Sequence, residues 1–359
     1  MTRDADPGPA IALTLGDPCG IGPELWVRIL CAEAAQRREG AIFSSGGGAG
    51  GARLHLYGDA GVLLRAATTL GLTTEWEQAI PTLTLHEVTR LEAAESVPGQ
   101  PSAASGAAQV AYLEAAIRAA ERGEVAGLCT APLHKAGAAA AGLRFPGHTE
   151  LLAARLGAEP SVVMMLAGPS LRVALCTTHL GLARVPAALS VDGIAGVLRT
   201  TALALHRDFG VRAPRLHVAA LNPHAGESGH FGDEEDRIIR PAIEKAQALP
   251  ELAELMPGLI IDGPLVPDAV FRAAVHPPLH SGRPDAVVAM YHDQGLIPLK
   301  LLDFDEAVNV TLGLSIVRTS PDHGVAYDLA GQGRARADSQ RAALHLCLEM
   351  VRRRSGLHL

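Results

Sequence analysis

The sequence of 359 residues is poor in aromatic and charged side chains. Phe, Tyr and Trp together make up 3% of it, and Asp, Glu, Lys and Arg make up 19%. So few aromatics argue against the base-stacking surfaces of proteins that bind single-stranded nucleic acid. The acidic net charge of −7 argues against DNA or RNA partners, whose phosphates attract an excess of Lys and Arg. The 48% of apolar residues still supplies enough material for a folded core.

Long apolar runs and paired cysteines are also missing. No stretch of about 18 apolar residues occurs, so we expect no membrane-spanning helix, and residues 1–7 lack the layout of a signal peptide. The five cysteines are widely spaced and form no CxxC pair, as in reduced proteins of the cytoplasm. We therefore expect a cytoplasmic protein. Histidine, in contrast, is frequent, with 15 residues, several of them in turns rich in Gly, Pro and Asp.

Predicted strands alternate with predicted helices along the chain. The expected strands are residues 11–15, 53–57, 125–129, 161–166, 172–176, 216–221, 258–261 and 286–290. The expected helices are residues 23–37, 60–70, 106–122, 149–155, 192–207, 233–248 and 339–353. This alternation is typical of βαβ units and predicts an α/β fold with a largely parallel sheet.

The length suggests two domains. We expect them to share the chain discontinuously, with a cleft between them: one formed by residues 1–147 and 308–359, the other by residues 148–307. The Gly-rich stretch 44–51 is expected to lengthen a surface loop.

Three histidines directly follow predicted strands. His179 comes after strand 172–176, His224 after strand 216–221 and His292 after strand 286–290. Open α/β sheets gather their functional groups at the carboxyl ends of strands. Three neutral imidazoles meeting there would suit a borderline divalent cation such as Zn²⁺, Co²⁺ or Mn²⁺. The alternative for any one of them is an ordinary loop histidine.

Three further polar residues have apolar neighbours in the sequence, namely Lys300, Asn309 and Arg318. Burying two cations and an amide is costly unless they meet an anion. A phosphate or carboxylate would satisfy them, because Arg can bind it bidentately and Lys adds a point charge. Alternatively, Lys300 and Arg318 extend to solvent.

Three turns are candidates for ligand contact. Gly16–Glu24 follows a strand, with Pro23 suited to the first helical position, and its backbone N–H groups could face an anion. His148 precedes Thr149, a natural N-cap, and could also meet an anion. The Gly-rich segment 322–333 could hold an adenosine group. The simpler interpretation of each turn is local chain geometry and capping.

Together these segments resemble the 4-hydroxythreonine-4-phosphate dehydrogenase family of vitamin B6 biosynthesis. The matching motifs run in order from Gly16 to Gly333: GDPCGIGPE, TAPLHK, FPGHTELLA, TTHLGL, LNPHAGESGHFGDEE, GPLVPDAVF, AMYHDQGLIPLK and VNVTLGLSIVRTSPDHGVAYDLAGQG. The resemblance implies a fold like that of isocitrate and isopropylmalate dehydrogenases.

The resemblance also implies the site residues. The implied metal ligands are His179, His224 and His292, the third contributed by the partner subunit of a homodimer. The implied substrate and phosphate contacts are His148, Thr149, Lys300, Asn309 and Arg318. The implied cofactor contacts are His323, Gly324 and Asp328. Asp293 and Lys300 are the expected catalytic residues.

The expected reaction is oxidation of 4-phosphooxy-L-threonine at its C3 hydroxyl, followed by decarboxylation to 3-amino-2-oxopropyl phosphate. It would use NAD or NADP and one divalent metal per site, such as Zn, Mg, Co or Mn. His134, where many relatives have Asn, leaves open a related dehydrogenase of a phosphorylated sugar acid such as 4-phosphoerythronate. A metal hydrolase with three histidine ligands and a non-catalytic phosphometabolite-binding protein also stay open.

Overall fold

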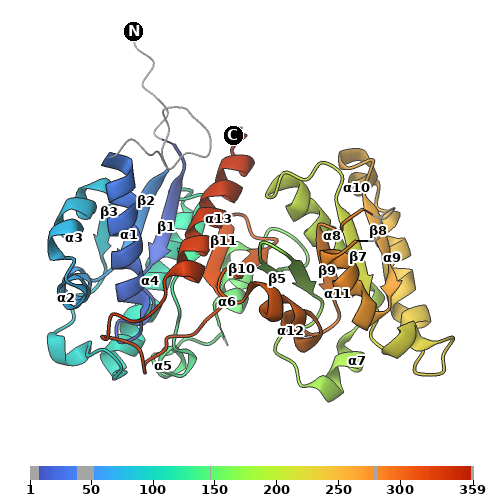
Figure 1. The fold of residues 1–359 in the computed structure, drawn as a ribbon, viewed down its shortest axis with the longest axis horizontal. Coiled ribbons are helices and arrows are strands. Elements are labelled where there is room, and N and C mark those ends of the chain that lie inside the picture. The colour runs from blue at the N-terminus through green and yellow to red at the C-terminus, as the bar shows by residue number, and fades with distance from the viewer. Residues whose placement is uncertain (1–7, 39–51, 146, 278–281, 357–359) are drawn as a thin grey trace, which may run out of the picture. The chain divides into compact units, whose positions relative to one another are not determined.

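The computed structural model describes residues 8–38, 52–145, 147–277 and 282–356 (Figure 1). The predicted insertion 44–51 lies outside these residues. The chain forms two compact units, unit 1 (Met1–Leu156 and Ile316–Leu359) and unit 2 (Gly157–Ser315). The expected boundaries at 147/148 and 307/308 fall near these, and whether the units are independent domains stays a prediction.

Unit 1 is built on parallel strands in the order β3-β2-β1-β4-β11. The strands are β1 (Ala10–Thr14), β2 (Arg53–Gly58), β3 (Thr84–Glu87), β4 (Gly127–Thr130) and β11 (Val317–Pro321). β1 and β4 are buried throughout, as expected of central strands covered on both faces.

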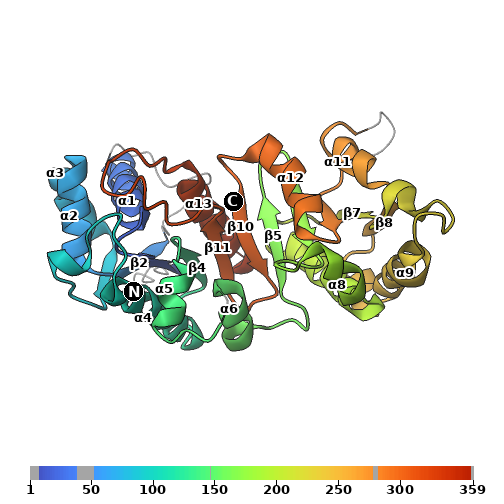
Figure 2. The same ribbon diagram turned by 90° about the horizontal axis from the view of Figure 1, so that it is seen from below.

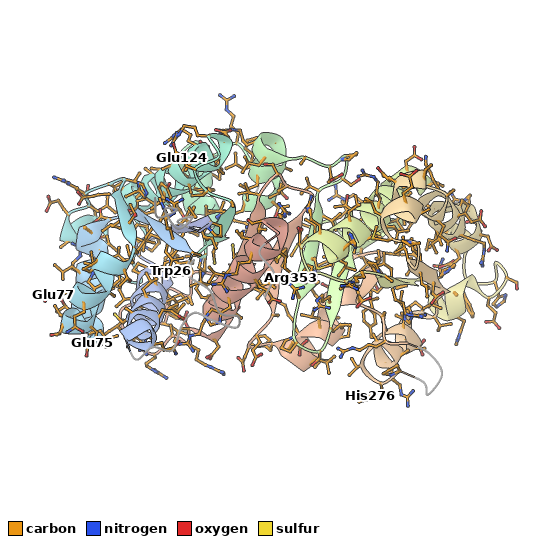
Figure 3. The ribbon with its side chains drawn as sticks, turned by 90° about the horizontal axis from the view of Figure 1, so that it is seen from above. Trp26, Glu75, Glu77, Glu124, His276 and Arg353 are labelled. Carbon is orange, nitrogen blue, oxygen red and sulfur yellow. The ribbon has the colours of Figure 1, made fainter. Side chains whose placement is uncertain are left out.

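Helices cover both faces of the unit 1 strands, with α1 and α13 on one side and α4 on the other (Figure 2). Trp26 points from α1 toward the sheet, and its Nε1–H donates to Thr14 O of β1 at 2.8 Å (Figure 3). The helices of this unit are α1 (Gly22–Arg38), α2 (Ala60–Leu70), α3 (Thr73–Ala79), α4 (Ala103–Glu121), α5 (Lys135–Ala140), α6 (His148–Leu156) and α13 (Asp338–Arg354).

Unit 2 has strands in the order β10-β5-β6-β9-β7-β8. β6, β9, β7 and β8 run parallel, whereas β5 is antiparallel to both β6 and β10. The strands are β5 (Val163–Ala167), β6 (Arg172–Leu175), β7 (Arg215–Ala219), β8 (Ile260–Leu265), β9 (Ala286–Ala289) and β10 (Val308–Leu312). The largely parallel sheet predicted from the sequence is therefore confirmed, with β5 as the antiparallel exception.

The helices of unit 2 also cover both faces, with α11 and α12 on one side and α8 and α9 on the other (Figure 2). They are α7 (Val185–Ala188), α8 (Val191–Arg207), a π-helical turn (Glu235–Ile239), α9 (Arg240–Gln247), α10 (Pro250–Leu255), α11 (Pro267–Val275) and α12 (His292–Asp303). The α/β fold class predicted from the sequence is confirmed.

Within the described ranges, no single helix is both long and apolar enough to cross a membrane. One sharply bent pair, Leu182–Ala188 and Val191–Arg207, meets the criterion by length and composition alone.

Candidate functional site

The three predicted metal ligands lie at one edge of the unit 2 sheet. β6, β9 and β7 are neighbours in that order and run parallel, so their carboxyl ends share an edge. His179 follows β6, His292 follows β9 and His224 follows β7. All three were expected beyond strand ends from their spacing in the sequence, and all three lie there.

Two of these histidines lie side by side. The ring centroids of His179 and His292 are 5.9 Å apart. His292 begins α12, and its Nδ1 lies 2.7 Å from Asp293 Oδ1. A carboxylate at Nδ1 holds the tautomer whose Nε2 is a lone-pair donor, the usual arrangement behind a metal-bound imidazole. The pair therefore fits a divalent cation in donor type and separation.

His224 does not join this pair. Its ring packs near Phe231, with centroids 5.9 Å apart, and both side chains are exposed. In the described part of the chain, no three His, Cys, Asp or Glu side chains come close enough to hold a metal ion. One chain therefore supplies a histidine pair and, separately, a single histidine.

Two residues that the sequence reasoning missed connect these strand ends. Gln294 accepts the Met290 N–H at Oε1 and donates from Nε2 to Ala220 O, both at 2.7 Å. Thr177 Oγ1 donates to Met290 O at 2.8 Å. Since Ala220 lies just past β7 and Met290 just past β9, Gln294 fixes one strand end against the other. A glutamine two residues after a histidine gave no recognisable signal in the sequence.

Lys300 and Asn309 also belong to unit 2. Lys300 lies in the last turn of α12 and Asn309 is on β10, where it pairs with Leu166 of β5. Both side chains are half-buried. Arg318, which the sequence pattern grouped with them, lies on β11 of unit 1.

Arg318 is a buried cation, with 2% of its surface exposed. Its Nη2–H donates to Thr130 Oγ1, at the end of β4, at 2.9 Å. Burial lowers the pKa of Arg318 to about 10, so the guanidinium stays charged at neutral pH.

His148 opens α6 near this cation. Burial, together with the positive charges of Arg318 and Lys135, lowers the pKa of His148 to about 3. The imidazole is therefore neutral at physiological pH and can offer one donor and one acceptor. Lys135, which the sequence reasoning gave no individual role, is an exposed cation at the start of α5. Two cations around a neutral histidine favour an anionic ligand.

Thr149 lies inside the first turn of α6, because the helix already begins at His148. The prediction that Thr149 caps this helix is therefore wrong. The prediction underestimated how far the helix extends toward Gly147, and helix ends vary by a residue or two in any sequence-based assignment.

The turn Gly16–Glu24 does not present its N–H groups as expected. Cys19 N–H donates to Asp17 Oδ1 at 2.8 Å, and Gly20 N–H to Asp17 O at 3.0 Å. Ile21 N–H donates to Val325 O at 3.0 Å. These three N–H groups therefore do not face an anion, because Asp17 and Val325 already accept them. For the other N–H groups of the turn the hypothesis stays a prediction.

The Gly-rich segment 322–333 packs on that turn. Tyr327 Oη donates to Asp17 Oδ2 at 2.6 Å, and Gly333 N–H donates to Glu24 Oε2 at 3.1 Å. Gly20 allows the close approach, since a Cβ there would lie 3.0 Å from Val325 O. The two motifs therefore form one structural element of unit 1.

The predicted cofactor residues lie on this segment. His323 Nδ1 is 3.1 Å from Gly324 O, and its Nε2 is buried with no hydrogen-bond partner among the described residues. Gly324 and Asp328 are exposed. An orphaned ring nitrogen fits a ligand that would hydrogen-bond to it.

A pocket of about 460 Å³ lies beside the same turn. None of the three predicted cofactor residues lines it. Its walls are Pro18, Gly20, Pro23, Glu24, Val62, Leu64, Arg65, Ala66, Thr68, Thr69, Ala93, Ser96, Val97, Pro98 and Gly331.

Comparison with known proteins matches residues 52–347 to the family described as pyridoxal phosphate biosynthetic protein PdxA. A 4-hydroxythreonine-4-phosphate dehydrogenase of Geobacter metallireducens is 46% identical over 353 residues, covering 96% of each chain. The enzyme of that name from Caulobacter vibrioides is 42% identical over 350 residues, covering 96% of this chain and 98% of the relative.

Solved structures of similar proteins agree with the sequence comparisons. The 4-hydroxythreonine-4-phosphate dehydrogenase of Klebsiella pneumoniae superposes with a TM-score of 0.75 at 35% identity, covering 96% of this chain and all of the other. A terephthalate 1,2-cis-dihydrodiol dehydrogenase of Burkholderia xenovorans superposes with a TM-score of 0.62 at 30% identity, covering 95% and 98%.

Proposed function

The chain belongs to the family of pyridoxal phosphate biosynthetic protein PdxA, and from that premise we propose that it is a 4-hydroxythreonine-4-phosphate dehydrogenase. The likeness to enzymes of that name along 96% of the chain is the observation on which this function rests. It makes the protein an oxidoreductase of pyridoxal phosphate biosynthesis. The substrate is 4-phosphooxy-L-threonine, oxidised at C3 to 2-amino-3-oxo-4-phosphooxybutanoate, which loses CO₂ to give 3-amino-2-oxopropyl phosphate.

In this proposal unit 1 binds an anionic group of the substrate. Arg318 supplies a buried, pre-oriented guanidinium, which suits bidentate contact with a phosphate. His148 and Thr149 supply uncharged hydrogen-bonding groups next to it. Because His148 is neutral, it adds no charge and can donate to an oxygen without competing for a proton. Lys135 adds a second positive charge nearby.

Unit 2 holds the metal ligands. His179 and His292 bind one divalent cation, for which Zn, Mg, Co and Mn are candidates, and Asp293 fixes the tautomer of His292. When bound, such a cation lowers the pKa of a coordinated hydroxyl and stabilises negative charge on its oxygen. Lys300 and Asn309 contribute further substrate contacts, and Lys300 with Asp293 is assigned to proton transfer.

The cofactor proposed is NAD, with NADP as the alternative, and it serves as the hydride acceptor. His323, Gly324 and Asp328 contact it. The buried Nε2 of His323 supports this assignment, because a ligand atom there would satisfy it.

A homodimer completes the metal site in this proposal. The resemblance implied that His292 comes from the partner subunit. Since His179 and His292 lie together in one chain, we propose instead that His224 is the ligand contributed by the second copy. α12 supports such an interface, because Ile297, Leu301 and Phe304 line one helical stripe and are 59%, 81% and 71% exposed. The five cysteines are free thiols, which agrees with a cytoplasmic location.

The decisive test of the function is NADH release followed by absorbance. The purified enzyme is given 4-phosphooxy-L-threonine or 4-phosphoerythronate, each with and without a chelator. We expect NADH from the first substrate, strong inhibition by the chelator, and little turnover of the second. Faster oxidation of 4-phosphoerythronate would move the assignment to the sugar-acid dehydrogenases. Product without NADH would indicate a hydrolase.

A further inference from the structure

The segment that bears His224 has an unusual backbone. All six residues from His224 to Gly229 have positive φ, between 43° and 89°. Four of them are not glycine, and L-residues avoid this left-handed region because Cβ approaches the carbonyl oxygen. Surrounding groups must therefore hold the segment in place, and strain of this kind is concentrated at functional sites.

The buried carboxylate of Glu235 binds the backbone just before this segment. Glu235 is 2% exposed, and its Oε1 accepts the N–H groups of Leu221 and Asn222 at 2.9 and 2.8 Å. Its Oε2 accepts the Asn222 amide at 3.0 Å. A Cβ on Gly226 would lie only 2.8 Å from that same oxygen, so the segment curls tightly around the carboxylate.

The position of Glu235 is itself fixed. It begins the π-helical turn Glu235–Ile239, which leads into α9, and Ile239 is fully buried. Such π-helical turns are rare and occur often at functional sites. Glu234 also accepts the Asn222 amide, at 2.7 Å. The left-handed segment is thus anchored at its start to a helix on the face of the sheet.

We propose that Glu235 is a positioning residue that holds the left-handed segment and thereby presents His224 to the metal. The inference rests on the proposed function, in which His224 is a metal ligand. Both carboxylate oxygens of Glu235 already accept hydrogen bonds from Leu221 and Asn222. Glu235 acts by fixing the backbone at Leu221 and Asn222, three and two residues before His224, as outer hydrogen bonds fix metal ligands elsewhere.

The test uses the full-length, metal-stripped protein titrated with Co²⁺, whose visible absorption reports both affinity and ligand geometry. We expect Glu235→Gln to weaken Co²⁺ binding about 10- to 100-fold and to alter the spectrum. Glu33→Gln is the matched control, since Glu33 is another buried glutamate, bonded to His345 in unit 1. It should change the affinity less than about twofold, because distant sites without shared partners act independently.

Two further measurements separate positioning from general stability. Amide hydrogen exchange at Leu221 and Asn222, measured without metal, should be faster in Glu235→Gln. Adding Ala225→Gly to Glu235→Gln should recover part of the lost affinity, because glycine adopts φ near 54° without strain. A merely structural role of Glu235 would not produce such recovery.

Wild-type affinity and spectrum in Glu235→Gln, with unchanged exchange, would overturn the inference. If that variant does not fold, Asn222→Ala replaces it in the test, since it removes only the two hydrogen bonds of the Asn222 amide. Unchanged Co²⁺ binding by Asn222→Ala would also overturn the inference. The His224→Ala variant distinguishes the role of His224 as a metal ligand from the positioning role of Glu235. Full Co²⁺ binding by His224→Ala refutes the ligand assignment itself, whereas loss in His224→Ala but not in Glu235→Gln refutes only the role of Glu235.

Discussion

The candidate functional residues of unit 1 contact one another within the chain, whereas those of unit 2 do so only in part. In unit 1 the polar groups are buried and bonded to each other, with Arg318 against Thr130 and Asp17 against Tyr327. In unit 2 the histidines lie at the sheet edge, two together and one apart. The folding of one chain therefore brings the proposed anion-binding groups together, whereas the proposed metal site would need a third ligand from a second copy.

The largest expected effect lies on the unit 2 side. His224→Ala should raise the Kd for the metal more than about 100-fold and abolish turnover with it, since removing a ligand exceeds the loss of an outer-shell contact. Metal content by mass spectrometry and NADH release measure the two. His276→Ala, an exposed histidine of the same unit, is the control (Figure 3). If His224→Ala kept its metal and its activity, His224 would not be a metal ligand, and unit 2 would not need a third ligand from a second copy.

The next effect lies on the unit 1 side. Arg318→Met should raise the KM for the phosphorylated substrate about 100-fold, because truncating one member of a buried charge pair costs about 2–5 kcal/mol. Metal affinity should change little. Steady-state kinetics give the KM, and Arg90→Met, whose side chain is 83% exposed, serves as control. An equal loss with a dephosphorylated analogue would show that Arg318 does not bind the phosphate.

Subunit mixing tests whether the metal ligands of unit 2 come from two subunits. Inactive His179→Ala and His224→Ala subunits, mixed, should regain about a quarter of wild-type activity, because half the dimers would hold one intact site of two. His179→Ala mixed with His292→Ala should regain nothing, since those two ligands come from the same chain. Rescue in the second mixture, or in neither once exchange is verified, would contradict the proposed sharing.

The smallest effect concerns the pH dependence of stability. In the folded protein the pKa of His148 is about 3, whereas in the unfolded chain it is about 6.5. The unfolded chain therefore binds more protons below pH 6.5, and stability falls as the pH falls. Between pH 7 and pH 5 the wild type should lose about 1–2 kcal/mol more than His148→Asn in urea unfolding. Equal losses would place His148 in a solvated environment.

The sequence predicted the elements whose pattern is strong and uninterrupted. The helix expected at residues 60–70 is α2 with the same bounds, and that at 106–122 is α4 (Ala103–Glu121). It did not predict α12, because Gly295 and Pro298 interrupt the helical pattern. Tertiary packing of α12 on β6 and β9 overrides those breakers.

The candidate site was predicted to a similar degree. The three histidines could be found because a histidine after a buried strand is a local pattern. Lys135 could not, since a lysine beginning a short helix resembles any surface lysine. Glu235 could not either, because its carboxylate bonds to residues thirteen and fourteen positions earlier.

The sequence alone determined the α/β fold and supplied the residue types of the proposed metal ligands, because these depend on local periodicity and residue type. Only the tertiary structure decided which of these groups meet. The order β6-β9-β7 sets which strand ends are neighbours, and within the described residues His224 does not form a three-ligand cluster with His179 and His292. Strand order and positive φ at non-glycine residues arise from long-range hydrogen bonds, which no local pattern encodes.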